Sequence, residues 1–195
     1  LEPDARQGAV EEPDSSRRKV VSFRRLVLSV WDNPEFACEL AYMANKLAGL
    51  RVLIITPDEH RHAVVPRLGL SNADLKGKFY DITELGFDDA GFFETLTEVE
   101  KDLYLLCLPS DKFQAEMQRQ LAESAINYAY RHFDITVAAL RRCLCTARDI
   151  FLFRKSDFVI IADTADLNTL LEWSGEIRLL KAVCGLQPEK IKFVA

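Results

Sequence analysis

The feature that most constrains this fold is a pair of apolar runs separated by one amphipathic segment. Val20 to Trp31 ends in LVLSVW, and Arg51 to Thr56 reads RVLIIT. Nearly continuous apolar runs of this length are typical of strands that are buried on both faces of a sheet. The segment between them, Asp32 to Gly49, begins with helix-capping residues and ends in the glycine that a helix terminus favours. This strand–helix–strand unit predicts parallel strands joined by a right-handed crossover.

The same alternation continues to the end of the chain. Further strands are expected at Leu103–Leu108, Phe133–Leu140, Asp157–Ala162 and Ile191–Val194. Further helices are expected at Val64–Leu70, Asp89–Val99, Asp111–Arg131, Arg141–Phe151 and Ala165–Cys184, the last as either one helix or two helices divided near Ser174-Gly175. In the first helix, spacing predicts a buried face made of Phe36, Leu40, Met43, Ala44 and Leu47. The predicted fold class is α/β, with three α/β/α layers around a mostly parallel sheet.

Composition and net charge limit the classes of protein and of partner that fit this sequence. The chain has 195 residues, of which 49% are hydrophobic and 28% charged, as in globular domains. Residues 1–18 are polar, so we expect a flexible linker or arm there and a single domain over 19–195. Because the sequence lacks an initiator methionine, we also expect a longer protein with a preceding segment. A net charge of −5 offers nucleic acid no general attraction, and five cysteines in apolar surroundings favour a cytoplasmic setting.

Glycine is scarce where a phosphate-binding loop would need it. The chain has 8 glycines, and none lies between Gly8 and Gly49. The turn after the first strand has no glycine, lysine, serine or threonine, and it brings three acids, Asp32, Glu35 and Glu39. A P-loop needs glycines for close backbone approach, a lysine for the β- and γ-phosphates and a hydroxyl for Mg²⁺. The sequence therefore predicts poor nucleotide binding at this turn, where Asp32 would instead cap the helix.

The order of the segments nevertheless resembles the MinD/ParA-like ATPases, and within them the TadZ/CpaE group of pilus-assembly localisation proteins. The resemblance covers about residues 19–195. Arg51 to Asp58 resembles the second strand with its acidic end, and Ser156 to Leu171 resembles the strand and helix that close the nucleotide pocket. The resemblance implies a P-loop NTPase-like (Rossmann-like) domain. It also implies work at the inner face of a bacterial membrane, through secretion or pilus components or through a homodimer.

The departures from that family fall at its catalytic positions. The lysine and threonine of the deviant Walker A loop fall near positions 37–39, the catalytic acid falls on Thr56, and the switch-strand aspartate falls near Ala139. By resemblance, a vestigial nucleotide pocket would consist of Asp32, Asn33, Pro34, Glu35, Phe36, Ala37, Cys38, Glu39, Asp58, Asp163 and Asp166. We assign no catalytic residue, no metal ligand and no cofactor, and ATP with Mg²⁺ is the disfavoured alternative.

Three hypotheses about function follow. The leading one is a non-catalytic scaffold that acts by protein–protein interaction in the localisation or assembly of a Tad-type pilus or secretion machine. The alternative is a regulatory switch that binds ATP without efficient hydrolysis. The third is an unrelated Rossmann-like enzyme that uses Cys38 or Asp58. In that case the dipole of the first helix turn would lower the pKa of the Cys38 thiol, and His132 would be its base.

Other clusters have ordinary structural interpretations. Two histidines, His60 and His62, and the Cys143-x-Cys145 pair lack the spacing of structural zinc sites. The basic residues Arg141, Arg142, Arg148, Arg154 and Lys155 are interpreted as a solvated face, so nucleic acid is not an expected partner. An apolar set, Phe92, Phe93, Leu96 and Trp173, could form a partner surface, but a buried core is the default interpretation.

Overall fold

The structure is a computed structural model, and it describes residues 25–58, 61–75, 89–108, 114–140, 146–163 and 167–194. The strands are β1 (Leu26–Trp31), β2 (Val52–Pro57), β3 (Thr97–Glu100), β4 (Leu103–Leu108), β5 (Ile135–Leu140), β6 (Phe158–Ala162) and β7 (Ile191–Val194). The helices are α1 (Pro34–Ala48), α2 (Arg61–Val64), α4 (Asp89–Thr95), α5 (Ala115–His132), α6 (Ala147–Lys155) and α7 (Leu167–Cys184). Two short 3₁₀ turns, η3 (Pro66–Leu68) and η4 (Pro188–Lys190), complete the described elements.

One seven-stranded sheet organises these elements, in the order β3-β4-β2-β5-β1-β6-β7. Every neighbouring pair is parallel except β3 and β4. Strand β1 lies between β5 and β6, and Val30 faces Ala139 on one side and Ile160 on the other. One strand pairs with it on each edge and helices cover both faces of the sheet, so its apolar run is buried as the sequence predicted.

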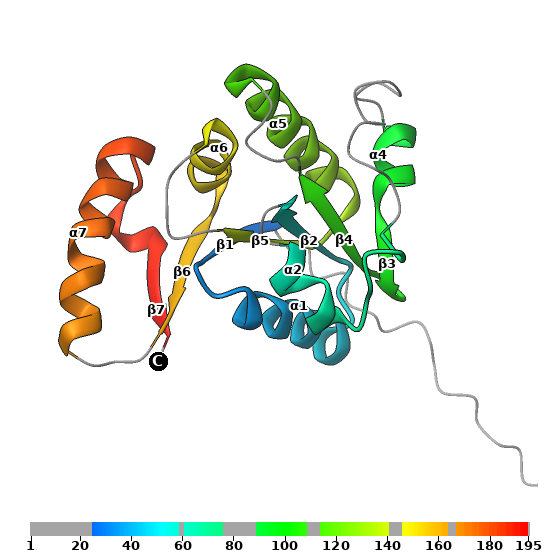
Figure 1. The fold of residues 1–195 in the computed structure, drawn as a ribbon, viewed down its shortest axis with the longest axis horizontal. Coiled ribbons are helices and arrows are strands. Elements are labelled where there is room, and N and C mark those ends of the chain that lie inside the picture. The colour runs from blue at the N-terminus through cyan, green and yellow to red at the C-terminus, as the bar shows by residue number, and fades with distance from the viewer. Residues whose placement is uncertain are drawn as a thin grey trace, which may run out of the picture.

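Helices cover both faces of the sheet (Figure 1). Side chains of α1, α2 and η3 pack with β1, β2, β4 and β5 in one core cluster. Side chains of α4, α5, α6 and α7 pack on the opposite face in the other cluster. The predicted three-layer α/β/α class is therefore confirmed. Helix α7 and strand β7 form one end of the molecule, next to β6 (Figure 1).

Helix α1 has the extent that the sequence predicts but buries a different face. The residues that contact the sheet are small, namely Ala37, Cys38 and Ala41. Met43 and Leu47, which were expected inside, are 57% and 77% exposed. The reason is that the small side chains let the helix backbone approach the sheet closely, which rotates the larger ones outward. The predicted buried face is therefore wrong for Met43 and Leu47, whereas Phe36, Leu40 and Ala44 are partly buried and pack against the core.

Other segments also differ from the sequence-based expectation. The segment 64–70 is not one helix, because α2 ends at Val64 and the 3₁₀ turn η3 follows it. The segment 89–99 is not one helix, because α4 ends at Thr95 and the following four residues form the antiparallel edge strand β3. Helix α7 continues through Ser174 and Gly175, so of the two alternatives for this segment the structure has the single helix. The expected arm at 1–18 and the start of the first predicted strand lie outside the described residues. Within the described ranges, no helix is both long and apolar enough to cross a membrane.

Candidate functional site

The carboxyl edge of the parallel strands is where open α/β sheets bind ligands. Asp32 follows β1, Asp58 follows β2 and Asp163 follows β6, so all three lie at this edge. Strands β1 and β6 are neighbours, whereas β5 separates β1 from β2. The structure therefore brings the Asp32 and Asp163 regions together and leaves Asp58 further along the edge. Asp166 lies outside the described residues.

The connection between β1 and α1 consists of only two residues, Asp32 and Asn33. Asp32 has a φ of 58°, in the left-handed region that aspartate tolerates better than most residues, and this turns the chain sharply. Its backbone N–H donates to the carbonyl of Leu140 at the end of β5, over 2.8 Å. A P-loop motif spans about eight residues, most of them ahead of the helix. The turn present here is far shorter than that cradle.

Asn33 fixes this turn with both ends of its side chain. Its Oδ1 accepts from the N–H of Phe36 at 2.8 Å, so Asn33 and not Asp32 is the N-cap of α1. Its Nδ2 donates to the carbonyl of Ala162 at the end of β6, over 2.9 Å. One amide side chain therefore joins the start of α1 to the neighbouring strand.

Few donors remain at the N-terminus of α1 for an anion. Pro34 at the first helical position has no N–H, and the N–H of Phe36 is used by the cap. The exposed side chains of Asp32, Glu35 and Glu39 are acidic, and the basic side chain of Arg67 is already paired with Glu35 at 3.2 Å. A phosphate group would meet one available amide among the first three positions of α1, together with like charge from the carboxylates.

Aromatic side chains fill the other side of this edge. Trp31, at the end of β1, is buried and packs edge-to-face against Phe153 of α6 and Trp173 of α7, with centroid distances of 5.5 and 5.1 Å. The Trp173 indole N–H donates to Oδ2 of Asp163 at 2.9 Å. Trp173 is thus a core residue that also holds the predicted pocket residue Asp163. The sequence could not reveal this contact, because the end of β6 and helix α7 come together only in the folded domain.

Asp58 belongs to a second, separate group of side chains. Its carboxylate pairs with Arg61, the first residue of α2, at 3.0 Å. Cys107 of β4 lies nearby, and burial, followed by the charge of Asp58, raises the pKa of its thiol to about 12. The neighbouring Thr56 is buried within β2. Nothing in this group of described residues provides a thiolate or a second carboxylate for catalysis.

The cysteine-enzyme hypothesis fails on geometry. Cys38 lies in the second turn of α1, is buried, and its Sγ is 4.0 Å from the carbonyl of Val64. Burial raises the pKa of this thiol to about 11, although the charge of Arg67 lowers it, so the expected lowering was wrong. The proposed base, His132, lies at the end of α5 on the opposite face and bonds Asp89 through Nε2 at 2.9 Å.

The other residues that the sequence singled out are either buried, exposed or outside the described ranges. Arg148 is fully buried and pairs with Asp149 at 2.9 Å, so its assignment to a solvated face was wrong. Phe92 is buried against Tyr128, whereas Phe93 is exposed. Among the described residues no group of three or more potential metal ligands exists. The residues His60, Arg141, Arg142, Cys143 and Cys145 lie outside the described ranges.

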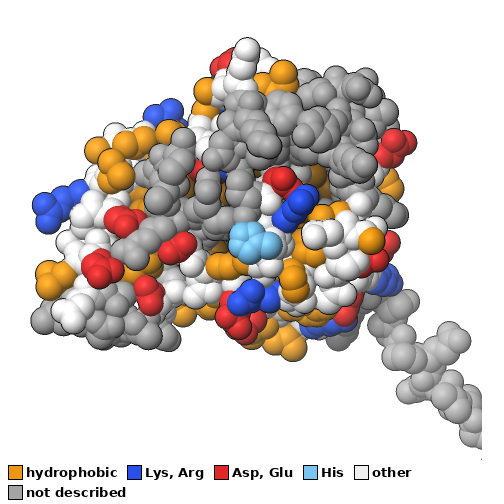
Figure 2. Space-filling model, viewed as in Figure 1, with side chains coloured by type: hydrophobic (Ala, Val, Ile, Leu, Met, Phe, Trp, Pro, Cys, Tyr) orange, Lys and Arg blue, Asp and Glu red, His pale blue; other side chains and the backbone are white. Residues whose placement is uncertain are grey.

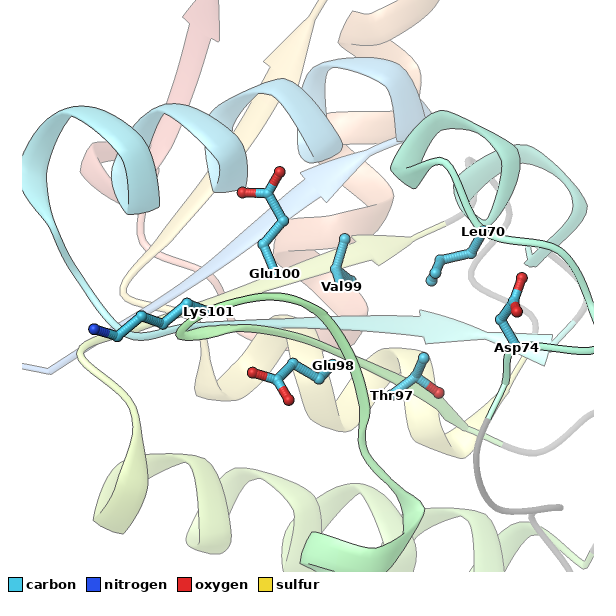
Figure 3. Close-up of a pocket in the computed structure, with 7 residues that line it drawn as sticks. All are labelled: Leu70, Asp74, Thr97, Glu98, Val99, Glu100 and Lys101. Atoms are coloured by element: carbon cyan, nitrogen blue, oxygen red, sulfur yellow. The ribbon is translucent and has the colours of Figure 1, made fainter.

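A pocket of about 480 Å³ lies beside the edge strand β3, four strands away from β1 (Figure 3). It is lined by β3, by Lys101 and by the loop residues Leu70 and Asp74. Its Glu100 accepts a hydrogen bond from Tyr42 of α1 at 3.1 Å and pairs with Lys46, whose hydrogen bond lowers the pKa of the Glu100 carboxyl group. This carboxylate ties α1 to the sheet edge, so we interpret the pocket as a structural feature.

Sequence comparison gives no relative that could assign a function. No family model matches the sequence, and no curated protein matches it. The structural comparison is informative, and it shows the fold of the ParA/MinD-type P-loop ATPases.

Three solved structures illustrate this likeness. A chain of the MinC:MinD cell division protein complex of Aquifex aeolicus has a TM-score of 0.65 and 16% identity, over 86% of this chain and 67% of that one. The ParA family ATPase of Chlorobium tepidum has a TM-score of 0.60 and 16% identity, over 87% and 73%. The cobyrinic acid a,c-diamide synthase of Mycobacterium smegmatis, with an ATP analogue and magnesium bound, has a TM-score of 0.59 and 15% identity, over 87% and 72%.

Proposed function

We propose that this domain is a non-catalytic, degenerate MinD/ParA-like scaffold that acts by protein–protein interaction. The observation that carries the proposal is the two-residue turn between β1 and α1, closed by Asn33. In P-loop proteins this position holds a longer glycine-rich loop whose amides surround the phosphates. Because fold and site are separable, a chain can keep the buried sheet of these ATPases without their chemistry.

The local charges support the same proposal. Catalysis of phosphoryl transfer depends on positioning and on positive charge around the transferred group. Here the turn and the first helical residues offer Asp32, Glu35 and Glu39, and Arg67 is already paired with Glu35. The pocket residues proposed from the resemblance would therefore repel a triphosphate. This is why we propose neither ATP nor Mg²⁺ as a cofactor.

The finer role rests on the resemblance in segment order to the TadZ/CpaE group. We propose that the domain helps to localise or assemble a Tad-type pilus or secretion machine from the cytoplasmic side of the membrane. Its partners would be components of that machine or a second copy of the chain, and its contact with the membrane would be indirect. The net charge of −5 gives no support for a nucleic-acid partner.

Thermal unfolding with and without Mg-ATP tests the proposal. A ligand at 100 times its dissociation constant stabilises a protein by about 2.7 kcal/mol, which is about 5–11 °C for a domain of this size. We expect no shift at millimolar Mg-ATP or Mg-ADP. The ParA family ATPase of Chlorobium tepidum, treated identically, is the matched control. A shift of several degrees would contradict the proposal, and phosphate release that Asp58→Ala abolishes would show an enzyme instead.

The second candidate is a regulatory switch that binds ATP without efficient hydrolysis. It is favoured by the fold likeness to a synthase that carries an ATP analogue and magnesium. The same melting experiment separates the two candidates, because a shift without phosphate release is what the switch predicts.

A further inference from the structure

Helix α1 has a second apolar stripe, which faces away from the sheet. The first stripe is the row of small buried residues that contacts the sheet. The second, the outer stripe, has larger side chains at steps of four, three and four residues, namely Phe36, Leu40, Met43 and Leu47. With 3.6 residues per turn, the two stripes lie about 140° apart around the helix. A helix that covers one face of a sheet needs only one such stripe, so the sheet does not require the outer stripe.

The outer stripe has the spacing of a contact between helices. Met43 is 57% and Leu47 is 77% exposed, whereas Phe36 and Leu40 pack partly against the core. Alternating steps of four and three residues are the spacing at which one helix contacts another along a coiled-coil seam. The four side chains extend over about 16 Å of the helix axis. The pattern therefore fits a second helix rather than a loop or an extended segment.

The two flanks of the outer stripe differ in charge. On one flank lie Glu39 and Lys46, which are exposed, opposite in charge and seven residues apart. On the other flank lie the small residues Ala37 and Ala44. When two copies of a helix pair antiparallel about a two-fold axis, each flank meets the same flank of the partner. A charged flank can then match itself only if it carries both signs, and this flank does.

We propose that the outer stripes of two copies of this chain pair with each other, with the two α1 helices antiparallel. The two-fold axis passes at the level between residues 41 and 42. Phe36 then packs against the partner's Leu47, and Leu40 packs against the partner's Met43, each contact occurring twice. The two exposed side chains of the outer stripe are thereby covered by the two that are half-buried.

The charges select the antiparallel arrangement. In this register the partner's Lys46 lies about 3 Å along the helix axis from Glu39, whereas the two copies of Glu39 are about 7.5 Å apart along it. Lys46 also pairs with Glu100 of its own chain, and its ammonium group has three N–H donors, so it can serve both carboxylates. A parallel pair would instead place the charged flank against the flank with Ala37 and Ala44, which carries no charge.

The position of α1 leaves the outer stripe accessible. Helix α1 lies at the lower edge of the molecule, with the sheet above it (Figure 1). Apolar side chains lie next to acidic and basic ones along that edge of the surface (Figure 2). Because the outer stripe lies about 140° from the stripe on the sheet, the partner helix approaches from outside and the two sheets point away from each other.

For its biological meaning the pairing rests on the proposed scaffold role. It deepens that role by naming the surface through which a second copy is bound. It also gives Phe36 and Glu39, which by resemblance belong to a vestigial nucleotide pocket, a part in protein contact.

Sedimentation of the full chain without nucleotide tests the pairing. We expect a weak, concentration-dependent dimer, because a single helix pair buries less than the roughly 1,200 Å² of a standard interface. Met43→Gln with Leu47→Gln should give a monomer with an unchanged circular dichroism spectrum. Leu171→Gln with Leu179→Gln changes two α7 residues that are 62% and 51% exposed, and this matched control should leave the dimer intact. A wild-type monomer would overturn the proposal, as would an α1 variant that dimerises as strongly as the wild type.

Charge exchange tests the register in a way that loss of folding cannot imitate. Glu39→Lys alone sets lysine against lysine at both ends of the interface, and Lys46→Glu alone sets glutamate against glutamate. Each change should weaken its homodimer about tenfold. A mixture of the two variants has opposite charges at both contacts, so heterodimers should exceed both homodimers in native mass spectrometry with one chain tagged.

The exchange has its own control and its own refuting result. Lys46→Glu also removes the pair with Glu100, so circular dichroism and melting of this variant are measured first. If the mixture holds no more heterodimer than random pairing gives, the antiparallel register is wrong.

The two proposals fail in different ways. A thermal shift with Mg-ATP would contradict the non-catalytic scaffold and leave the α1 pairing standing. A wild-type chain that shows neither a shift nor a dimer would overturn the pairing and leave the scaffold standing.

Discussion

Replacing Asn33 with alanine removes both hydrogen bonds that fix the β1–α1 turn. Loss of an N-cap side chain costs about 1 kcal/mol, and the second bond, from Nδ2 to the carbonyl of Ala162, contributes about 1 kcal/mol more. We therefore expect Asn33→Ala to lower the free energy of unfolding by about 2 kcal/mol. For a domain of this size that corresponds to about 4–8 °C in Tm.

Asn33→Ser separates the two contributions. Its hydroxyl can still accept from the N–H of Phe36, but it cannot reach the carbonyl of Ala162, so we expect about half of the alanine effect. Urea unfolding followed by circular dichroism measures all three chains under one condition. The reasoning is refuted if Asn33→Ala unfolds within about 0.5 kcal/mol of the wild type, or if serine is as harmful as alanine.

Two further predictions follow from titratable groups. Hydrogen bonds from Arg131 and His132 hold the pKa of Asp89 below its ordinary value of 3.8, so its stabilising effect is present above that value and is lost as pH falls through the lower, folded pKa. Urea midpoints of Asp89→Asn should therefore fall less steeply than wild type across this acidic window, and equal slopes would contradict the assignment. Because burial raises the pKa of Cys38 to about 11, iodoacetamide at neutral pH should leave this thiol unmodified in the folded chain, and rapid labelling detected by peptide mass would contradict its burial.

The sequence predicted the elements that carry strong local signals. Helix α1 begins at Pro34 and ends at Ala48, just before the cap residue Gly49, because Pro34 and Gly49 have backbone preferences that act locally. The burial of β1 and β2 also follows from their apolar runs. Strand β3 was missed because Phe92, Leu96 and Val99 repeat at nearly helical spacing, although Val99 actually lies in the strand. Pairing with β4 overrides that pattern.

The candidate site was predictable in place but not in detail. Asp32, Asp58 and Asp163 share one edge because each directly follows a strand and these strands are parallel. What the sequence could not provide are the contacts of Asn33 with Ala162 and of Trp173 with Asp163. The first of these joins residues 129 positions apart and depends on β1 and β6 becoming neighbours. No propensity or spacing encodes such a contact, since it exists only once the sheet has formed.

A connection of two residues also limits how this chain can evolve. Single-base changes alter the side chains at Asp32 and Asn33, but they cannot lengthen the turn toward the roughly eight residues of a phosphate cradle. An insertion there would detach the Asn33 side chain from β6 and displace the start of α1. We therefore expect an insertion at this turn to destabilise the domain. Substitutions on the exposed surfaces leave this turn unchanged, and they can alter which molecules the domain meets.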